Sequence, residues 1–221
     1  MSRLTSAQTT AGLSLFRYVL GSRFDDLAPA LRRHYDLPPG HSVIVEGLMD
    51  AWNRLPWARP FAPFMPVPGQ GQRVRVRNRG LLDEAGRPCY EWVREFHTAS
   101  GLAGSYTLTR PTPRTMPFPA VLDCFNQPST IGLTLHVEIA DSGRALVMHT
   151  RGPQYLILGK RLAPLARPLR VDTVAIERVV ADDAQRIATV VIVSHAVLGK
   201  LFGYQGVLTV REPDEVGGQT V

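Results

Sequence analysis

The sequence of 221 residues contains no run of eighteen apolar residues, so no transmembrane helix is predicted. Its first ten residues are polar and lack the apolar core of a secretory signal. Cysteine is scarce, because Cys89 and Cys124 are the only two and they form no CxxC motif. Two thiols in a chain of this length favour a reducing compartment over a disulfide-bonded scaffold. We therefore expect a cytoplasmic protein with no membrane span.

Motifs that bind cofactors are also missing. The chain has no P-loop, no GxGxxG after a strand, no HExxH, no GxSxG and no cysteine-rich metal spacing. It therefore has no nucleotide-binding loop of a known type, and a cofactor-dependent enzyme is disfavoured. We expect no cofactor and no bound metal.

Lysine is as scarce as cysteine, since Lys160 and Lys200 are the only two, yet the net charge is +6 because arginine is abundant. A basic chain can bind nucleic acid. Charged residues nevertheless make up an ordinary 20% of the chain, so we expect no nucleic-acid partner. Alternating arginines are instead expected on the solvent face of an edge strand, where charge opposes aggregation. These are Arg73, Arg75, Arg77 and Arg79.

The N-terminal part predicts helices and an irregular flap. Residues 11–33 carry apolar side chains three and four apart, and they predict a helix. Residues 49–57 predict a second helix by the same spacing. Five prolines between positions 56 and 68 then exclude regular structure. Large apolar side chains in that stretch indicate a flap that covers a site, namely Trp57, Phe61, Phe64 and Met65.

From residue 72 onward the apolar spacing becomes two, which is typical of β-strands. Short connections favour antiparallel neighbours, and about eight strands at this spacing predict a barrel or a strongly curved sheet. We therefore expect a mainly β (α+β) fold: an antiparallel β-barrel or strongly curved sheet that encloses a cavity, with one or two N-terminal helices. Residues 1–221 should form a single domain, with the cap and flap over 11–70 and the sheet over 72–210. Strands are expected at residues 42–48, 72–77, 89–97, 104–109, 120–125, 131–140, 145–151, 171–181, 187–197 and 206–210.

One predicted strand places three aromatic side chains and an arginine on the same face: Tyr90, Trp92, Arg94 and Phe96. If this face points inward, the guanidinium of Arg94 must meet a carboxylate or an anionic ligand, because an unpaired buried charge is too costly. The alternative is a core aromatic cluster in which Arg94 makes a structural ion pair.

Asp123 follows apolar residues in another predicted strand and requires a hydrogen-bond donor, for which Arg94 is the candidate. His195 ends the most apolar predicted strand, and it is either hydrogen-bonded in the core or lines the cavity. If the fold brings Asp123 and His195 together, they form an acid–base pair. The candidate catalytic residues are thus Asp123, His195 and Arg94. The candidate ligand-binding residues are Tyr90, Trp92, Phe96, Tyr106 and Tyr204.

Residues 131–151 predict a hairpin whose turn contains Ser142-Gly143. In that register His136 lies opposite His149, and Glu138 lies diagonal to His149 on the same face. Two imidazoles and a carboxylate could hold a metal or act as acid and base. The alternative that we favour is an apolar face in the core and a solvated polar face.

Short motifs along the chain resemble a bacterial domain-of-unknown-function family, number 4166. They are Leu15-Phe16-Arg17, Leu20-Gly21-Ser22-Arg23-Phe24, the W-x-R-x-F pattern of Trp92, Arg94 and Phe96, Leu198-Gly199, and Tyr204-Gln205-Gly206. The resemblance covers residues 13–210 and implies a β-rich domain, either alone or beside reductase-like modules, with no assigned chemistry. Two positions depart from the family pattern, at Asp123-Cys124-Phe125-Asn126 and at His195. Both put polar groups where the family is plainer.

Three functions agree with these observations. The favoured one is a cofactor-independent enzyme that holds a lipophilic molecule in an apolar cavity and moves a proton, as a cyclase, isomerase or lyase. The second is a binding or carrier protein for an apolar ligand. The third is an interaction module with a filled core. The expected partner is a lipophilic small molecule, and a homodimer stays open.

Overall fold

The structure is a computed structural model, and it describes residues 12–54, 68–98, 101–113, 116–125, 130–180, 183 and 185–211. Within these residues eleven strands form one sheet in which all pairings are antiparallel. The strands are β1 (Ser42–Asn53), β2 (Gly69–Leu82), β3 (Pro88–Thr98), β4 (Gly101–Pro111), β5 (Ala120–Phe125), β6 (Ile131–Ala140), β7 (Ala145–Leu158), β8 (Arg161–Pro164), β9 (Asp172–Val179), β10 (Arg186–His195) and β11 (Gly199–Val210).

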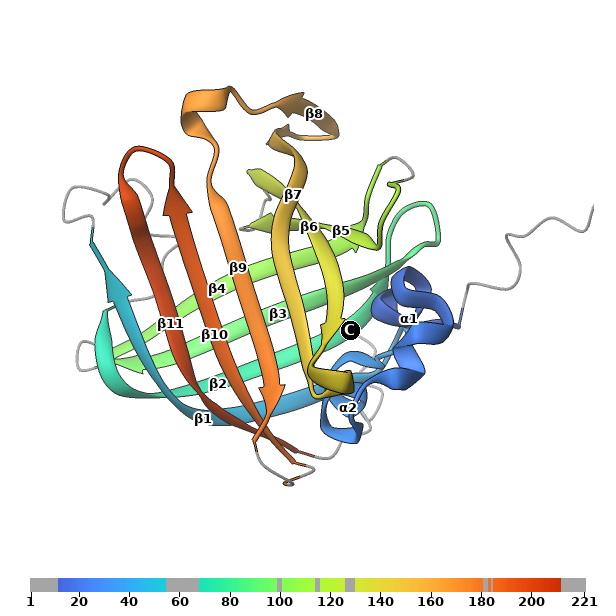
Figure 1. Ribbon diagram of the computed structural model, residues 1–221, viewed down its shortest axis with the longest axis vertical. Helices are drawn as coiled ribbons and strands as arrows, with labels where there is room; N and C mark the ends of the chain where they lie inside the picture. The colour runs from blue at the N-terminus through green and yellow to red at the C-terminus, as the bar shows by residue number, and fades with distance from the viewer. Residues whose placement is uncertain are drawn as a thin grey trace, which may run out of the picture.

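Ten of these strands form a closed barrel (Figure 1). Their order is β6-β5-β4-β3-β2-β1-β11-β10-β9-β7, and the pairing of β6 with β7 closes the ring. Strand β8 pairs with the end of β7 and stands above the ring. The predicted mainly β fold with N-terminal helices is confirmed. No helix in the described part of the chain is long and apolar enough to cross a membrane.

The N-terminal residues form two short helices where the sequence predicts one. The helical segments are α1 (Leu15–Leu20), a 3-10 helix (Gly21–Asp26) and α2 (Pro29–Tyr35), with short 3-10 turns at Asp141–Gly143 and Arg167–Leu169. Helix α1 ends at Gly21, which adopts a φ of 59° that favours glycine. Helix α2 begins with a proline, whose fixed φ suits the first turn. The glycine and the proline thus divide the predicted helix.

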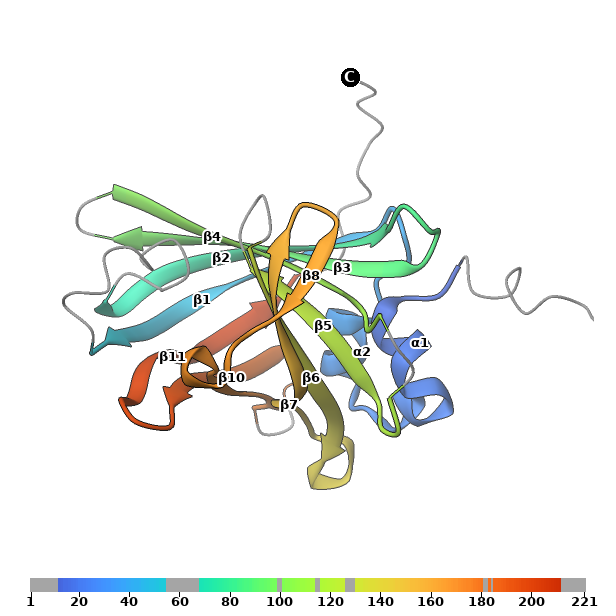
Figure 2. The ribbon, with the colours of Figure 1, turned by 90° about the horizontal axis from the view of Figure 1, so that it is seen from above.

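Both helices lie at the same end of the barrel (Figures 1 and 2). Their buried side chains, which include Phe16, Leu31 and Tyr35, pack in one core with strand residues such as Tyr90 and Leu208. Burial of large apolar side chains stabilises this contact by about 1.5–3 kcal/mol for each residue. The helices therefore close this end of the barrel.

Residues 49–53 belong to a strand, so the second predicted helix is wrong. They extend β1, which pairs with β11 and β2 on its two sides. Trp52 lies opposite Gly203, where an added Cβ would come within 2.6 Å of the indole ring. Because Gly203 has no side chain, the indole of Trp52 has room on this strand. Hydrogen bonds from β1 to its two neighbouring strands outweigh the helix-like spacing of the apolar residues.

Strand β2 is not the edge strand that the sequence predicts, because it pairs with β1 and β3. Its valines, Val74 and Val76, are buried, whereas Arg73, Arg75 and Arg77 are exposed. Arg75 lies opposite Glu46 on β1, with 3.6 Å between Nε and Oε1. The outward arginines of β2 therefore meet carboxylates of neighbouring strands as well as solvent.

Candidate functional site

The barrel interior holds a cavity of about 80 Å³. Much of its wall is apolar, with side chains such as Phe125, Leu135 and Met148. Ionisable side chains also line it, and these are Arg94, Tyr106, Asp123, Glu177 and Tyr204. Ionisable groups are costly inside an apolar wall unless they are paired, and groups of this kind cluster at functional sites. The interior is therefore the candidate site.

A chain of hydrogen bonds crosses the cavity wall from β3 through β4 to β5. Trp92 Nε1 donates to Thr109 Oγ1 at 2.9 Å, and the Thr109 hydroxyl donates to Asp123 Oδ1 at 2.6 Å. Burial raises the pKa of Asp123 above 3.8, while the Thr109 hydrogen bond and the charge of Arg94 act in the opposite direction. The Asp123 carboxyl is thus held closer to its protonated form than an exposed aspartate would be.

Arg94 reaches the cavity from β3, beside this chain of hydrogen bonds. Its Nη1 donates to Thr107 Oγ1 at 3.1 Å, and its guanidinium carbon lies 5.0 Å from the centre of the Trp92 ring. The charge of Arg94 also acts on the buried Tyr204 phenol, whose pKa burial raises. Among the ion pairs of the described residues, none involves Arg94. The predicted hydrogen bond between Arg94 and Asp123 is replaced by the one from Thr109.

A second buried carboxylate, Glu177 on β9, lines the cavity where α2 meets the barrel. Its Oε2 accepts a hydrogen bond from the Tyr35 hydroxyl at 2.8 Å, and its Oε1 accepts one from Thr189 at 3.3 Å. His34 Nε2 lies 3.3 Å from Glu177 Oε2, but the angle does not make a hydrogen bond. Burial lowers the pKa of His34 and outweighs the opposite effect of Glu177. His34 is therefore a neutral imidazole at neutral pH.

Four of the five predicted ligand-binding residues line the cavity, namely Trp92, Phe96, Tyr106 and Tyr204. Tyr90 instead belongs to the core beneath the helices, where its hydroxyl donates to the His34 carbonyl at 2.5 Å. Tyr90 lies on the same face of β3 as Trp92, but at the end of the barrel that the helices close, and strand parity does not reveal that position. Burial, together with the nearby Glu91, raises the pKa of the Tyr106 phenol to about 12.

His195 does not reach Asp123, so the predicted acid–base pair is not assembled. It ends β10, and its Nε2 lies 2.8 Å from the Pro168 carbonyl. Its Nδ1 accepts hydrogen bonds from the amides of Val197 and Leu198, at 3.2 and 3.3 Å. Backbone groups thus engage both ring nitrogens, and His195 holds the turn between β10 and β11.

A second hollow, of about 320 Å³, involves β1, β10 and β11. Trp52, Arg54 and Lys200 line it, and the Arg54 guanidinium carbon lies 5.8 Å from the Trp52 ring centre. Among the described residues its lining contains neither a carboxylate nor an imidazole, so these residues offer no acid–base pair.

The predicted flap, with Trp57, Phe61, Phe64 and Met65, lies outside the described residues.

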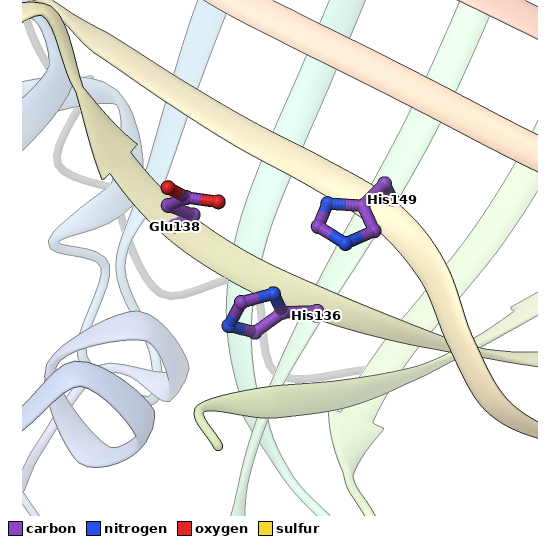
Figure 3. A group of neighbouring side chains, drawn as sticks. All are labelled: His136, Glu138 and His149. Carbon is purple, nitrogen blue, oxygen red and sulfur yellow. The ribbon is translucent and has the colours of Figure 1, made fainter.

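The predicted register of the β6–β7 hairpin is correct, since His136 lies opposite His149. The two imidazole rings are 5.0 Å apart at an angle of 87°, and Glu138 lies beside them (Figure 3). Ligand atoms of the three residues all lie within 4.8 Å of one another. Burial, followed by the neighbouring His149 and Arg151, lowers the pKa of His136. These side chains lie on the outer face, because the alternate residues Leu135 and Val137 are buried in the core.

Glu177, His34 and Tyr35 also belong to the barrel interior, although no residue pattern singled them out. Glu177 lies on the same face of β9 as Thr173 and Ala175, which also line the cavity, so strand parity could have predicted its position. His34 and Tyr35 end a helix that packs on the barrel, and nothing in their spacing predicts this contact.

Comparison with known families gives one result, and comparison with curated proteins gives no match. The family model described as "Domain of unknown function (DUF4166)" matches residues 27–208. The match covers most of the chain and includes the cavity residues Arg94, Asp123 and Glu177. The motifs of helix α1, which lie before residue 27, fall outside the match.

Proposed function

Because the chain belongs to this family, whose description names no activity, we propose its function from the barrel interior alone. The cavity binds a small, largely apolar molecule through an oxygen atom, and it catalyses a proton transfer on that molecule without a cofactor. The reaction is of the isomerase, cyclase or lyase type. One observation carries the proposal: Arg94 lies in the cavity wall with hydroxyl and aromatic partners and without a carboxylate partner among the described residues.

Arg94 supplies the binding and polarising group. A guanidinium has several donors in one plane, and it binds a carboxylate or polarises a carbonyl oxygen with charge-assisted hydrogen bonds. Arg94 Nη1 donates a hydrogen bond to Thr107, and the guanidinium makes a cation–π contact with the face of the Trp92 ring. These contacts orient Arg94 without neutralising its charge, so the charge remains available for a ligand oxygen.

Asp123 supplies the proton. Its raised pKa brings it closer to the range in which a carboxyl group can both donate and accept a proton. The hydrogen bond from Thr109 fixes one carboxyl oxygen, Oδ1, and leaves the other for a substrate. Glu177 lines the same cavity, but Tyr35 and Thr189 already engage it, so we give it a structural role.

The volume of the cavity limits the ligand. A space of about 80 Å³ is smaller than the ~150 Å³ cavity that accommodates benzene. The reacting part of the substrate is therefore small, and any longer apolar part extends toward Val193 and Phe202, which line the cavity near the β10–β11 turn. The buried thiols Cys89 and Cys124 fit a reducing compartment, and we place this activity in the cytoplasm.

The first experiment is native mass spectrometry of the purified protein, followed by denaturing extraction of any bound molecule. A stoichiometric small molecule with a carboxylate or carbonyl group would support the proposal and name its ligand. Thermal unfolding with hexanoate and with hexanol then isolates the role of Arg94. We expect stabilisation by hexanoate alone, and we expect Arg94→Met to abolish it by weakening binding ~10–100-fold. Arg77→Met, on the exposed face of the neighbouring strand, is the control.

Binding without turnover is the second candidate, because the same Arg94 would serve a carrier protein. Deuterium exchange next to the carbonyl group of 2-hexanone, followed by NMR in D₂O, separates the two. An enzyme would catalyse the exchange and lose it in Asp123→Asn while retaining hexanoate binding. A carrier would bind hexanoate in both forms and exchange no proton. A protein with no bound molecule and no response to hexanoate would contradict both.

A further inference from the structure

The outer wall of the barrel carries a second group of chemically active side chains, away from the interior cavity. His136 and Glu138 lie on β6, and His149 lies on β7 directly opposite His136. One ligand atom from each residue can be chosen so that all three lie within 4.8 Å of one another. Figure 3 shows the three side chains together on one side of the two strands.

The backbone beneath these side chains is held firmly. Strands β6 and β7 pair along most of their length, and β6 also pairs with β5 and β7 with β9. The alternate residues Leu135, Val137 and Met148 are buried in the core, so the two histidines must point outward. Sites built on paired strands hold their ligands more accurately than sites on loops.

His136 has an unusual environment for an outward-facing histidine. Its Nδ1 atom is buried and has no hydrogen-bond partner among the described residues. The Phe118 ring packs edge-on against the imidazole, with 4.9 Å between the ring centres. Buried polar atoms without a partner are rare in native proteins, and a bound ion is one established explanation.

We propose that His136, Glu138 and His149 bind a divalent transition-metal ion of the zinc type. Two imidazoles and one carboxylate form the nitrogen and oxygen set that suits zinc and its neighbours in the first transition row, whereas calcium and magnesium prefer oxygen alone. Three protein ligands leave one coordination position open, as in catalytic zinc sites. This site is independent of the function proposed for the interior.

The geometry requires a small adjustment to close around an ion. Ligand atoms around zinc, at about 2.0–2.2 Å from the metal, lie roughly 3–3.5 Å apart in a tetrahedron. The present separations reach 4.8 Å, so at least one side chain must rotate. Glu138 is exposed and free to do so.

The test uses tag-free protein that has been stripped with EDTA and dialysed. We expect calorimetric titration with zinc chloride to show one equivalent of zinc bound per chain. Titration with cobalt chloride should produce the visible absorption of a nitrogen- and oxygen-ligated cobalt ion. Loss of an outer-shell partner alone weakens metal sites by about 10–100-fold, so His149→Gln and Glu138→Gln should weaken zinc binding at least as much.

The matched control is His97→Gln, which removes an exposed histidine near the end of β3 and should leave zinc affinity unchanged. Thermal unfolding without metal should be the same for all variants, since the substituted side chains lie on the outer face, and this shows that each variant is folded. The proposal is wrong if the wild-type protein binds no zinc stoichiometrically. It is equally wrong if folded His149→Gln binds zinc as the wild type does.

Discussion

The Tyr35 hydroxyl donates a 2.8 Å hydrogen bond to Glu177 Oε2, and this contact joins helix α2 to strand β9 inside the barrel. Both side chains are buried, with relative exposures of 0% for Tyr35 and 5% for Glu177. Thr189 on β10 donates to the other carboxylate oxygen. The glutamate therefore connects the helical end of the barrel to two neighbouring strands, next to the candidate site.

Replacement of Tyr35 with phenylalanine tests this connection. The variant keeps the ring but removes the donor, and it leaves Glu177 Oε2 buried without its hydrogen bond. We expect the free energy of unfolding, measured by urea denaturation, to fall by about 1–3 kcal/mol. Tyr18→Phe is the control, since Tyr18 is 41% exposed and should lose almost nothing. Equal losses in the two variants would contradict the role of Glu177 as a buried anchor.

The neutral state of His34 predicts that the protein loses stability in acid. Burial lowers the pKa of His34 below 6.5 in the folded chain, whereas the unfolded chain keeps the ordinary value. Below pH 6.5 the unfolded state binds a proton that the folded state does not, so stability falls as pH falls. Urea denaturation on both sides of this pH should show a smaller fall in His34→Gln. His97→Gln, at an exposed position, should keep the wild-type slope.

Local strand patterns could be predicted because alternation is a property of adjacent residues. The alternating arginines and valines of β2 follow from it, whereas the His136–His149 pairing follows from the short turn between two adjacent strands. Closure of the ring could not be predicted, since it depends on the pairing of β7 with both β6 and β9. The same limit applies to strand ends: the sequence pattern does not show that His195 falls in a turn with its nitrogens on backbone groups.

The candidate site was predicted in part, because alternation along a strand shows which residues share a face. Arg94 and Asp123 belong to strands whose parity puts them among apolar neighbours, and both line the cavity. Tyr90 shares this parity but packs beneath the helices, because parity does not show where along the barrel the cavity lies. Thr109, which connects Trp92 to Asp123, depends on the register of three strands, and no spacing within one strand reveals it.

The two cysteines should react slowly in the folded protein. Burial raises the pKa of Cys89 to about 12 and that of Cys124 to about 11, so neither forms appreciable thiolate at neutral pH. Because the thiolate is the reactive form, we expect Ellman's reagent to modify both thiols slowly in buffer and rapidly in urea. Cys89→Ser should leave one slowly reacting thiol. Rapid modification of the folded wild-type protein would show that one of the thiols is accessible and ionised.

The raised pKa of Asp123 has the opposite effect on stability from that of His34. Above pH 3.8 the unfolded chain releases the Asp123 proton, while the folded chain retains it up to its higher pKa. Within this window the folded state binds more protons, so the contribution of Asp123 to stability decreases as pH rises. The difference in unfolding free energy between Asp123→Asn and the wild type, taken at each pH, isolates this contribution from that of His34. We expect the variant to gain stability relative to the wild type as pH rises through the window.

Two further variants make the Asp123 prediction specific. Thr109→Val removes the hydrogen bond that lowers the pKa of Asp123, so the window should extend to higher pH. Asp172→Asn changes an exposed aspartate at the start of β9 and should follow the wild type at every pH. If Asp123→Asn also follows the wild type, the carboxyl is ionised as in solvent and cannot hold the proton that the proposed reaction requires. If the pH window extends to higher pH in Thr109→Val, the strand register that places Thr109 beside Asp123 sets the proton affinity of the candidate acid.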